Sequence, residues 1–172
     1  TEAYVGPETG DLRHATPEQL RAWEISDENR RILGTANRTG VVCYLVPPWS
    51  YLPDEEMEAA AEEWADAFAV FSAKHKGLPL YYKILSEPNN TGTSFERCVQ
   101  VLKYAHRGIL KGDPDAKILG LNTSKFDWGR QKYVWGRGAL DYVYGVGVHP
   151  YTGARHGSKK PERVHGMGNL MN

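Results

Sequence analysis

The sequence contains little cysteine and no long apolar run, and these shortages exclude several classes of protein. Its two cysteines, Cys43 and Cys98, are too few for a disulfide framework and lack metal-type spacing, so we predict buried thiols. The longest apolar stretches fall far short of the roughly 20 residues that cross a bilayer. The first residues also lack the basic start and apolar core of a signal peptide. We therefore expect no membrane partner, and the compartment stays open, because a mature secreted chain would have lost its signal.

The sequence also lacks an excess of either charge. Lysine plus arginine number 21, aspartate plus glutamate number 21, and the formal net charge is +0. No stretch forms a basic stripe, so we expect no nucleic acid as a partner. The six histidines are scattered, and the closest set, His149, His156 and His165, lacks the short spacing of metal ligands on one helix or strand. We predict no metal site, no cofactor, and a small or neutral ligand.

What is present is the composition of one ordered domain over residues 1–172, with 41% hydrophobic and 24% charged residues. Four nearly continuous apolar runs are typical of strands that are buried on both faces. The intervals between them leave room for the helix of a right-handed βαβ crossover. We predict an α/β fold with about four parallel strands, paired in chain order, at 41–46, 79–85, 116–121 and 142–148.

Helical patterns fill the intervals between these strands. The clearest pattern places Trp64, Phe68 and Phe71 on one apolar stripe. Residues 1–25 are predicted to be mostly loop, with a possible short helix from Thr16. We predict further helices at 26–39, from Asp54 to Lys76, from a capping box of Thr93 and Glu96 to Gly112, at 129–137 and from Pro161.

Polar and aromatic residues follow each predicted strand. Because the carboxyl ends of parallel strands meet at one edge and the connecting loops converge there, ligands bind at this edge. Amide, imidazole and phenol groups form hydrogen bonds with hydroxyls, while an indole covers the apolar side of a sugar ring. We therefore predict a carbohydrate ligand, bound by residues among Trp49, Glu87, Asn89, Asn90, Asn122, His149 and Tyr151.

Structural explanations stay open for each of these residues. Packing under a loop would account for Trp49, and turn formation would account for Asn89 and Asn90. His149 precedes a proline and could bond its own backbone, and Glu87 could be a solvated loop residue. The pattern alone leaves both kinds of explanation standing.

A resemblance to a known family strengthens the carbohydrate interpretation. "ILSEPNN" at 84–90 resembles the fourth-strand motif of the retaining glycoside hydrolases built on a (β/α)8 barrel, in which Asn-Glu-Pro carries the acid/base glutamate. "GVVCYLVPPW" at 40–49 resembles their third strand, "DPDAKILG" at 113–120 the start of the fifth, and "DYVYGVGVHPY" at 141–151 the sixth, with its His-x-Tyr. The resemblance covers about 24–155 and is closest to the xylosidase, iduronidase and cellulase-like members. It implies a partial TIM-barrel-type fold, strands three to six of such a barrel.

The resemblance also implies a retaining mechanism. In this mechanism one carboxylic acid protonates the departing glycosidic oxygen, and a second carboxylate, about 5–5.5 Å away, attacks the anomeric carbon. By resemblance Glu87 is the general acid/base, and its pKa should be raised by partial burial and by the neighbouring carboxylate. The resemblance implies substrate contacts, beside the catalytic pair or along the sugar subsite, from Trp49, Ser86, Asn89, Asn122, His149 and Tyr151.

Two departures from the family pattern matter. Ser86 stands where the family has an asparagine whose amide reaches the sugar's 2-hydroxyl, and a serine could do so only through a water or a shifted sugar. After Tyr151 the sole carboxylate is Glu162, and Pro161 marks it as part of a helix start, so we predict that the nucleophile is absent from this chain. A closed barrel typically needs about 250 residues, and its first two strands are not recognised in the sequence. We expect the remaining barrel segments, or self-association, to cover the open sheet edges.

Three interpretations follow. The leading one is a glycosidase, an O-glycosyl hydrolase whose isolated chain has little activity. The alternative is a non-catalytic carbohydrate-binding or scaffold protein derived from a glycosidase barrel, because Ser86 and a missing nucleophile are what a decayed enzyme would show. A third is an open α/β domain of unrelated function, since a fold alone does not fix activity. Against the third, no glycine-rich phosphate loop follows a strand.

Overall fold

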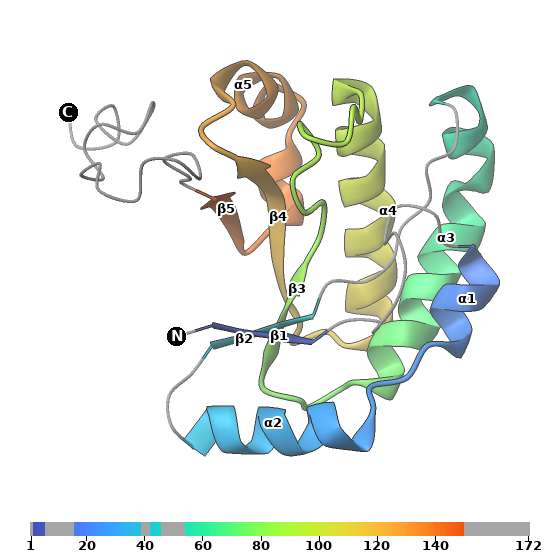
Figure 1. Cartoon of the computed structure of the whole chain (residues 1–172). Helices are drawn as coiled ribbons and strands as arrows, with labels where there is room; N and C mark the ends of the chain where they lie inside the picture. The colour runs from blue at the N-terminus through green and yellow to red at the C-terminus, as the bar shows by residue number, and fades with distance from the viewer. Residues whose placement is uncertain (1, 6–15, 39–41, 46–53, 150–172) are drawn as a thin grey trace, which may run out of the picture.

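Five short parallel strands pair in their order along the chain to form one sheet (Figure 1). The computed structural model describes residues 2–5, 16–38, 42–45 and 54–149. The predicted α/β fold with parallel strands in sequential order is confirmed, and the four predicted strands correspond to β2 through β5. The strands are β1 (Glu2–Val5), β2 (Val42–Leu45), β3 (Leu80–Lys83), β4 (Lys117–Ser124) and β5 (Gly145–His149).

The first strand corrects the sequence-based prediction. The pattern over residues 1–25 predicts mostly loop, but β1 pairs in parallel with β2 and places Glu2 opposite Val42. β1 is four residues long and glycine and proline follow it at once in the sequence, so it is too short to show a periodicity. The sheet therefore has one strand ahead of the one that resembles a third barrel strand. At the other end, a 3-10 turn, η1 (Ala139–Tyr142), occupies the predicted start of β5.

The predicted helices up to residue 137 are present, with small shifts of their ends. None of the described helices is long and apolar enough to cross a membrane. The final helix predicted from Pro161 lies outside the described residues. The helices are α1 (Pro17–Ala22), α2 (Asp27–Arg38), α3 (Asp54–Lys74), α4 (Phe95–Gly112) and α5 (Trp128–Gly136).

Helix capping differs from the prediction. The capping box lies at α1, where the Thr16 hydroxyl accepts a hydrogen bond from the Gln19 backbone N–H (3.2 Å) and the Gln19 side chain accepts one from the Thr16 N–H (2.9 Å). At α4 the cap is Ser94, whose hydroxyl accepts a hydrogen bond from the Arg97 N–H (3.1 Å). The capping box predicted at Thr93 is therefore wrong by one residue, because the neighbouring serine has the extended backbone that a cap requires.

The two longest helices, α3 and α4, lie side by side on one side of the sheet (Figure 1). The ring centroids of Trp64 and Phe68 on α3 each lie 6.0 Å from that of Tyr104 on α4, and all three side chains are buried. The helix backbones also approach closely at Gly108, where a Cβ atom would collide with the carbonyl oxygen of Ala65. This layer supports the sheet from one face and fixes where the strands end.

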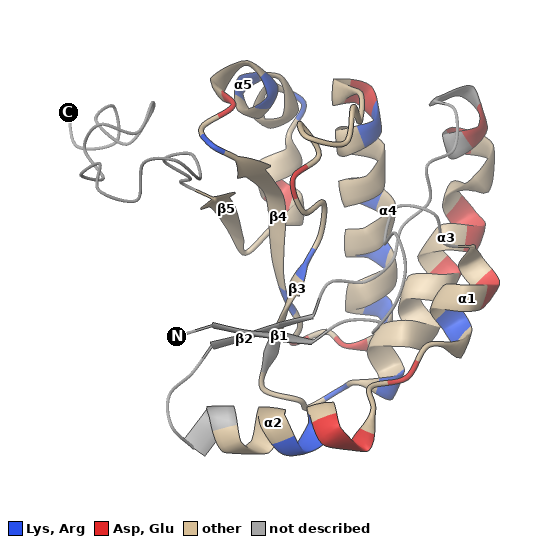
Figure 2. Cartoon of the chain, in the orientation of Figure 1, with Lys and Arg blue, Asp and Glu red and all other residues tan. Residues whose placement is uncertain are grey.

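Charges of both signs cover the outer side of this layer. Figure 2 shows acidic residues along α3 and basic residues along α4. Arg107 lies 2.6 Å from Glu62, and Lys111 lies 2.9 Å from Asp66, so each pair joins α4 to α3. All four side chains are at least half exposed, and such pairs contribute little to stability. The packing of the helices therefore depends on the buried rings and the close glycine contact.

The Gly108 contact leads to a stability prediction. Gly108→Ala should lower the free energy of unfolding by about 1–3 kcal/mol, because the added methyl overpacks the α3–α4 contact and outweighs the roughly 1 kcal/mol that alanine gains in a helix. Gly136→Ala in α5 is the matched control, because nothing lies within 4 Å of the position that its Cβ would take. Urea denaturation of both variants measures the effect, and a Gly108→Ala protein as stable as Gly136→Ala would contradict the packing assignment.

A buried histidine ties α1 to α3. His75 is 1% exposed, and its ring centroid lies 4.6 Å from that of Phe71 and 5.4 Å from that of Trp23, which follows α1. Neither ring nitrogen has a well-formed hydrogen bond. Burial lowers the pKa of His75 from 6.5 to about 4, against a smaller opposing effect of the Phe71 backbone. The imidazole is therefore neutral in the folded protein at pH 7.

His75 makes stability depend on pH. Because its pKa is lower in the folded state, the unfolded state binds the proton more readily, so stability is full above about pH 6.5 and falls as the pH drops toward 4. Between pH 7 and pH 5 the wild type should lose about 2 kcal/mol more than His75→Phe, which has no titrating ring at this position. Chemical denaturation at several pH values measures the two slopes, and parallel slopes would show that His75 is not the group responsible.

Candidate functional site

The pairing between β3 and β4 continues beyond Lys83 and carries Glu87 to the carboxyl edge of the sheet. The Ile84 N–H donates to the Leu119 carbonyl (2.8 Å), and the Glu87 N–H donates to the Asn122 carbonyl (2.7 Å). Ser86 forms an isolated parallel bridge with Asn122. Proline follows Glu87 and ends the pairing. The position of Glu87 at the tip of this strand, predicted from the sequence, is what the structure shows.

The backbone at this tip is strained. Leu85 and Glu87 have φ angles of 60° and 52°, Leu121 within β4 has a φ of 52°, and Lys125, directly after β4, has a φ of 58°. These are left-handed conformations that cost about 1–2 kcal/mol for a residue with a side chain. Such residues persist only where their surroundings hold them, and they cluster at functional sites. Strained backbone is therefore found at the edge of the sheet that carries the Ser-Glu-Pro motif.

The β4–β5 pairing contains an irregularity beside the site. Gly120 lies opposite Val146 and Thr123 lies opposite Val148, so β4 has one residue more than β5 between these two pairs. Bulges of this kind redirect side chains and are frequent next to active sites. Beyond the bulge, pairing resumes and places His149, the last residue of β5, opposite the end of β4.

These features bring Glu87 and His149 into contact across the tip of β4. Glu87 Oε1 lies 2.6 Å from His149 Nδ1, and Glu87 Oε2 accepts a hydrogen bond from the Asn90 side-chain amide (2.8 Å). The Glu87 side chain is 25% exposed and that of His149 is 19% exposed, so a ligand can reach the pair. A carboxyl and an imidazole at this distance share a hydrogen bond whichever of the two holds the proton. The pair is therefore suited to acid–base chemistry.

The structure gives backbone partners to two amides that the resemblance assigns to the sugar subsite. Asn89 donates to the Ser124 carbonyl (2.7 Å) and accepts from the Ser124 N–H (2.9 Å). Asn122 is 2% exposed and donates to the carbonyls of Ile84 (2.9 Å) and Leu119 (3.2 Å). These contacts favour a structural role for both amides, and a subsite role for Asn122 and Asn89 stays a prediction.

The other predicted site residues divide into two groups. Ser86 is partly buried and lies at the same edge as Glu87 and His149. Trp49 and Tyr151 lie outside the described residues. The carboxyl edge thus brings together Ser86, Glu87, Asn90 and His149 among the residues chosen from the sequence. Within the described part of the chain, no group of three histidine, cysteine or acidic residues could hold a metal ion.

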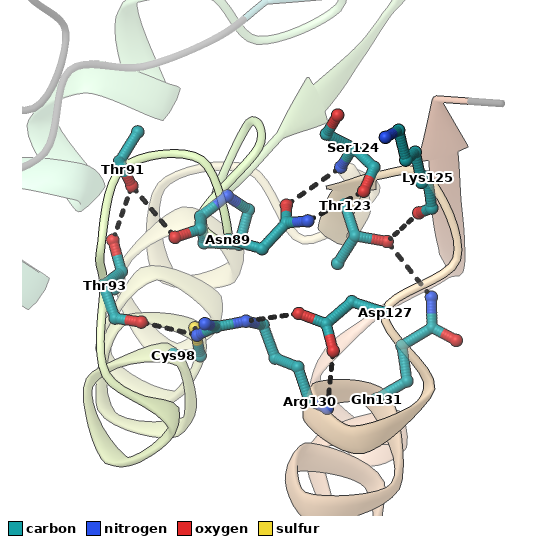
Figure 3. A network of polar contacts seen from close by, with 11 residues as sticks. Asn89, Thr91, Thr93, Cys98, Thr123, Ser124, Lys125, Asp127, Arg130 and Gln131 are labelled. Carbon is teal, nitrogen blue, oxygen red and sulfur yellow. Dashed lines mark hydrogen bonds and ion pairs between the residues drawn. The ribbon is translucent and has the colours of Figure 1, made fainter. Parts of the chain in front are cut away.

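Sequence reasoning missed the polar network that supports this edge from α5 (Figure 3). Arg130 is 7% exposed, its Nε lies 3.2 Å from Asp127, it donates to the Thr93 carbonyl, and its guanidinium carbon lies 4.5 Å from the centre of the Phe95 ring. Asp127 also accepts a hydrogen bond from the Arg130 N–H (3.0 Å) and so caps α5. The sequence pattern that could have indicated this network is Asp127 three residues before Arg130 at a helix start. This pattern is common at helix N-termini and did not stand out.

A hollow lies on the helical layer, between α3, α4 and η1. It measures about 480 Å³, and none of the predicted site residues lines it. Two of its lining residues, Gln100 and Tyr104, hold buried oxygen atoms with no hydrogen-bond partner. The lining residues are Glu58, Ala61, Gln100, Lys103, Tyr104, His106, Arg107 and Tyr142.

Comparison with models of known protein families gave no match, and a search of curated proteins gave none either. The Glu87–His149 pair and the motifs around it are therefore what indicates a function for this chain. The class that the geometry defines is a parallel α/β protein with an acid–base pair at the carboxyl edge of its sheet.

The contacts of Asn122 give a prediction. Asn122→Ala should lower the free energy of unfolding by about 1–3 kcal/mol, because two backbone carbonyls lose a buried donor. Asn90→Ala, which removes an exposed amide from the same edge, should change stability by less than about 0.5 kcal/mol. Thermal or urea denaturation distinguishes the two. If both variants are equally stable, Asn122 has no structural role and its place in a ligand subsite must be reconsidered.

Proposed function

We propose that this chain contributes the acid/base half of a retaining glycoside hydrolase site, within a partial (β/α)8 barrel. The observation that supports this most directly is the Glu87 carboxyl at the tip of a parallel strand, a quarter exposed and bonded to His149. The sequential order of the five parallel strands is the order that successive strands have in a barrel. The Ser-Glu-Pro sequence and the His-x-Tyr pattern add the resemblance to these enzymes.

The contacts of Glu87 suit the role of a general acid. In the proposed reactive state the His149 Nδ1–H donates to Oε1, and Oε2 holds the acidic proton while accepting a hydrogen bond from Asn90. The proton on Oε2 then passes to the glycosidic oxygen as the bond to the leaving group breaks. In the second step the same carboxylate removes a proton from the water that attacks the anomeric carbon.

The second carboxylate of the mechanism comes from elsewhere in this proposal. The contacts described for Glu87 are with an imidazole and an amide, and the nucleophile is expected about 5–5.5 Å away. In the family pattern it lies at the tip of the strand that follows the one equivalent to β5. We assign it to a further segment of polypeptide that completes the barrel and covers the edge of β5.

A non-catalytic carbohydrate-binding protein is the second candidate, and one observation favours it. Ser86 replaces the asparagine that would hold the 2-hydroxyl, and the nearby amides of Asn89 and Asn122 are engaged with the backbone. The edge therefore offers fewer amide groups to a sugar than an active relative would. In this alternative, the Glu87–His149 pair binds sugar hydroxyls without transferring a proton.

Hydrolysis of aryl glycosides tests the proposal. In a form of the protein that includes the nucleophile segment, Glu87→Ala should lower kcat/KM by about 10²–10⁴-fold for poor leaving groups, which need a proton, and far less for good ones. Glu62→Gln, an exposed carboxylate on α3, should leave both rates unchanged. The 172-residue chain alone should be close to background.

Three results would count against the enzyme proposal. Equal losses for good and poor leaving groups would exclude general acid catalysis by Glu87. Strong activity of the 172-residue chain would mean that the nucleophile is misplaced. Sugar binding without hydrolysis in every form would favour the binding protein.

A further inference from the structure

The Asn89 side chain joins the loop after β3 to the tip of β4, beyond the Glu87 N–H bond to the Asn122 carbonyl. The Asn89 amide forms two hydrogen bonds with the backbone of Ser124, one donated (2.7 Å) and one accepted (2.9 Å), as Figure 3 shows. Both polar atoms of the amide are used, as the N–H and C=O of a residue are used when two strands pair. Asn89 lies two residues after Glu87, so this attachment lies directly behind the carboxyl.

The same tip of β4 holds the histidine. Ser124 is paired with His149 in the β4–β5 register, and the Lys125 N–H donates to the His149 carbonyl (2.8 Å). The Asn89–Ser124 attachment therefore joins the segment that holds Glu87 to the strand that holds His149. The side chains of Glu87 and His149 meet above this junction.

The conformation of Glu87 makes such an attachment necessary. Its φ of 52° is unfavourable for a glutamate, and Lys125, on the other side of the junction, has a φ of 58°. Released from their neighbours, both residues would relax to more favourable backbone angles and turn the carboxyl and the imidazole apart. Two hydrogen bonds to the Ser124 backbone oppose this relaxation.

Side chains of helix α5 support the junction. Gln131 donates to the Thr123 hydroxyl (3.3 Å), which in turn donates to the Lys125 carbonyl (2.9 Å). Arg130 donates to the Thr93 carbonyl at the far end of the same loop (Figure 3). The backbone that Asn89 contacts is thus held by a buried network, and the Asn89 amide joins the part of the loop next to Glu87 to it.

We propose that Asn89 is a positioning residue that sets the contact between Glu87 and His149 by holding the loop after β3 on the tip of β4. Its effect on catalysis rests on the proposed function, whereas its effect on the Glu87–His149 contact does not. Asn89 contacts neither reacting group in the structure and acts through the backbone.

The first experiment measures the contact itself in the 172-residue chain. The imidazole ¹⁵N and N–H proton resonances of His149, assigned with His149→Gln, report the hydrogen bond from Nδ1 to Glu87. Asn89→Asp retains an acceptor but loses the donor to the Ser124 carbonyl, so the His149 resonances should shift. Asn29→Asp on α2 adds the same charge far from the site and should leave them unchanged. Unchanged His149 resonances in a folded Asn89→Asp protein would overturn the proposal.

The second experiment uses kinetics in a form that includes the nucleophile segment. Misplacement of a catalytic group by about 1 Å costs on the order of 10²-fold, so Asn89→Asp should lower kcat/KM by about that factor for poor leaving groups and by much less for good ones. A uniform loss would point to a merely structural residue and would also overturn the proposal. Shifted His149 resonances without hydrolysis by any form would support the positioning role and refute the glycosidase.

A second variant, Asn89→Ser, is included in case the Asn89→Asp protein does not fold. Asn89→Ser, whose hydroxyl is one bond too short for either hydrogen bond, adds no charge and should shift the His149 resonances as Asn89→Asp does. If Asn89→Asp does not fold, the Asn89→Ser protein decides the matter by the same two measurements. A folded Asn89→Ser protein with wild-type resonances and wild-type leaving-group dependence would contradict the proposal.

Discussion

The 2.6 Å contact between Glu87 and His149 exists because three parallel strands end at one edge of the sheet. The two residues are 62 positions apart in the chain, and the tip of β4 lies between their strands. Antiparallel pairing of β3 or β5 would send one of the two side chains to the opposite edge. The strained backbone and the bulge in β4 both affect the relative positions of these strand tips.

The helical layer provides the rigidity that this edge requires. The space between α3 and α4 is filled by the rings of Trp64, Phe68 and Tyr104. At Gly108 the backbones of the two helices are in direct contact. Because protein interiors are packed as densely as organic crystals, a strand that rests on such a layer cannot shift freely along its axis. Packing of the helical layer thus adds to the hydrogen bonds at the strand tips in holding Leu85 and Glu87 in unfavourable conformations.

The sequence alone was sufficient for those parts of the structure that follow from strong local patterns. A short apolar run and a proline located Glu87 at a strand tip, whereas β1 was missed because four residues show no period. The sequence could not tell Ser94 from Thr93 as a cap, since both side chains can accept the same hydrogen bond. Nor could it show that Asn122 faces backbone carbonyls, because that depends on a bulge formed only when β4 pairs with β5.

The bulge in β4 also limits how this protein can change in evolution. Pairing with β3 keeps one register across the bulge, so loss of one residue at Leu121 would shift every later residue of β4 by one position against β3. Asn122 would then no longer lie opposite Ser86, although the pairing of Thr123 and Ser124 with β5 would become regular. A point substitution at this tip leaves the register of the strands unchanged, whereas the deletion of a single codon would shift the whole tip against β3.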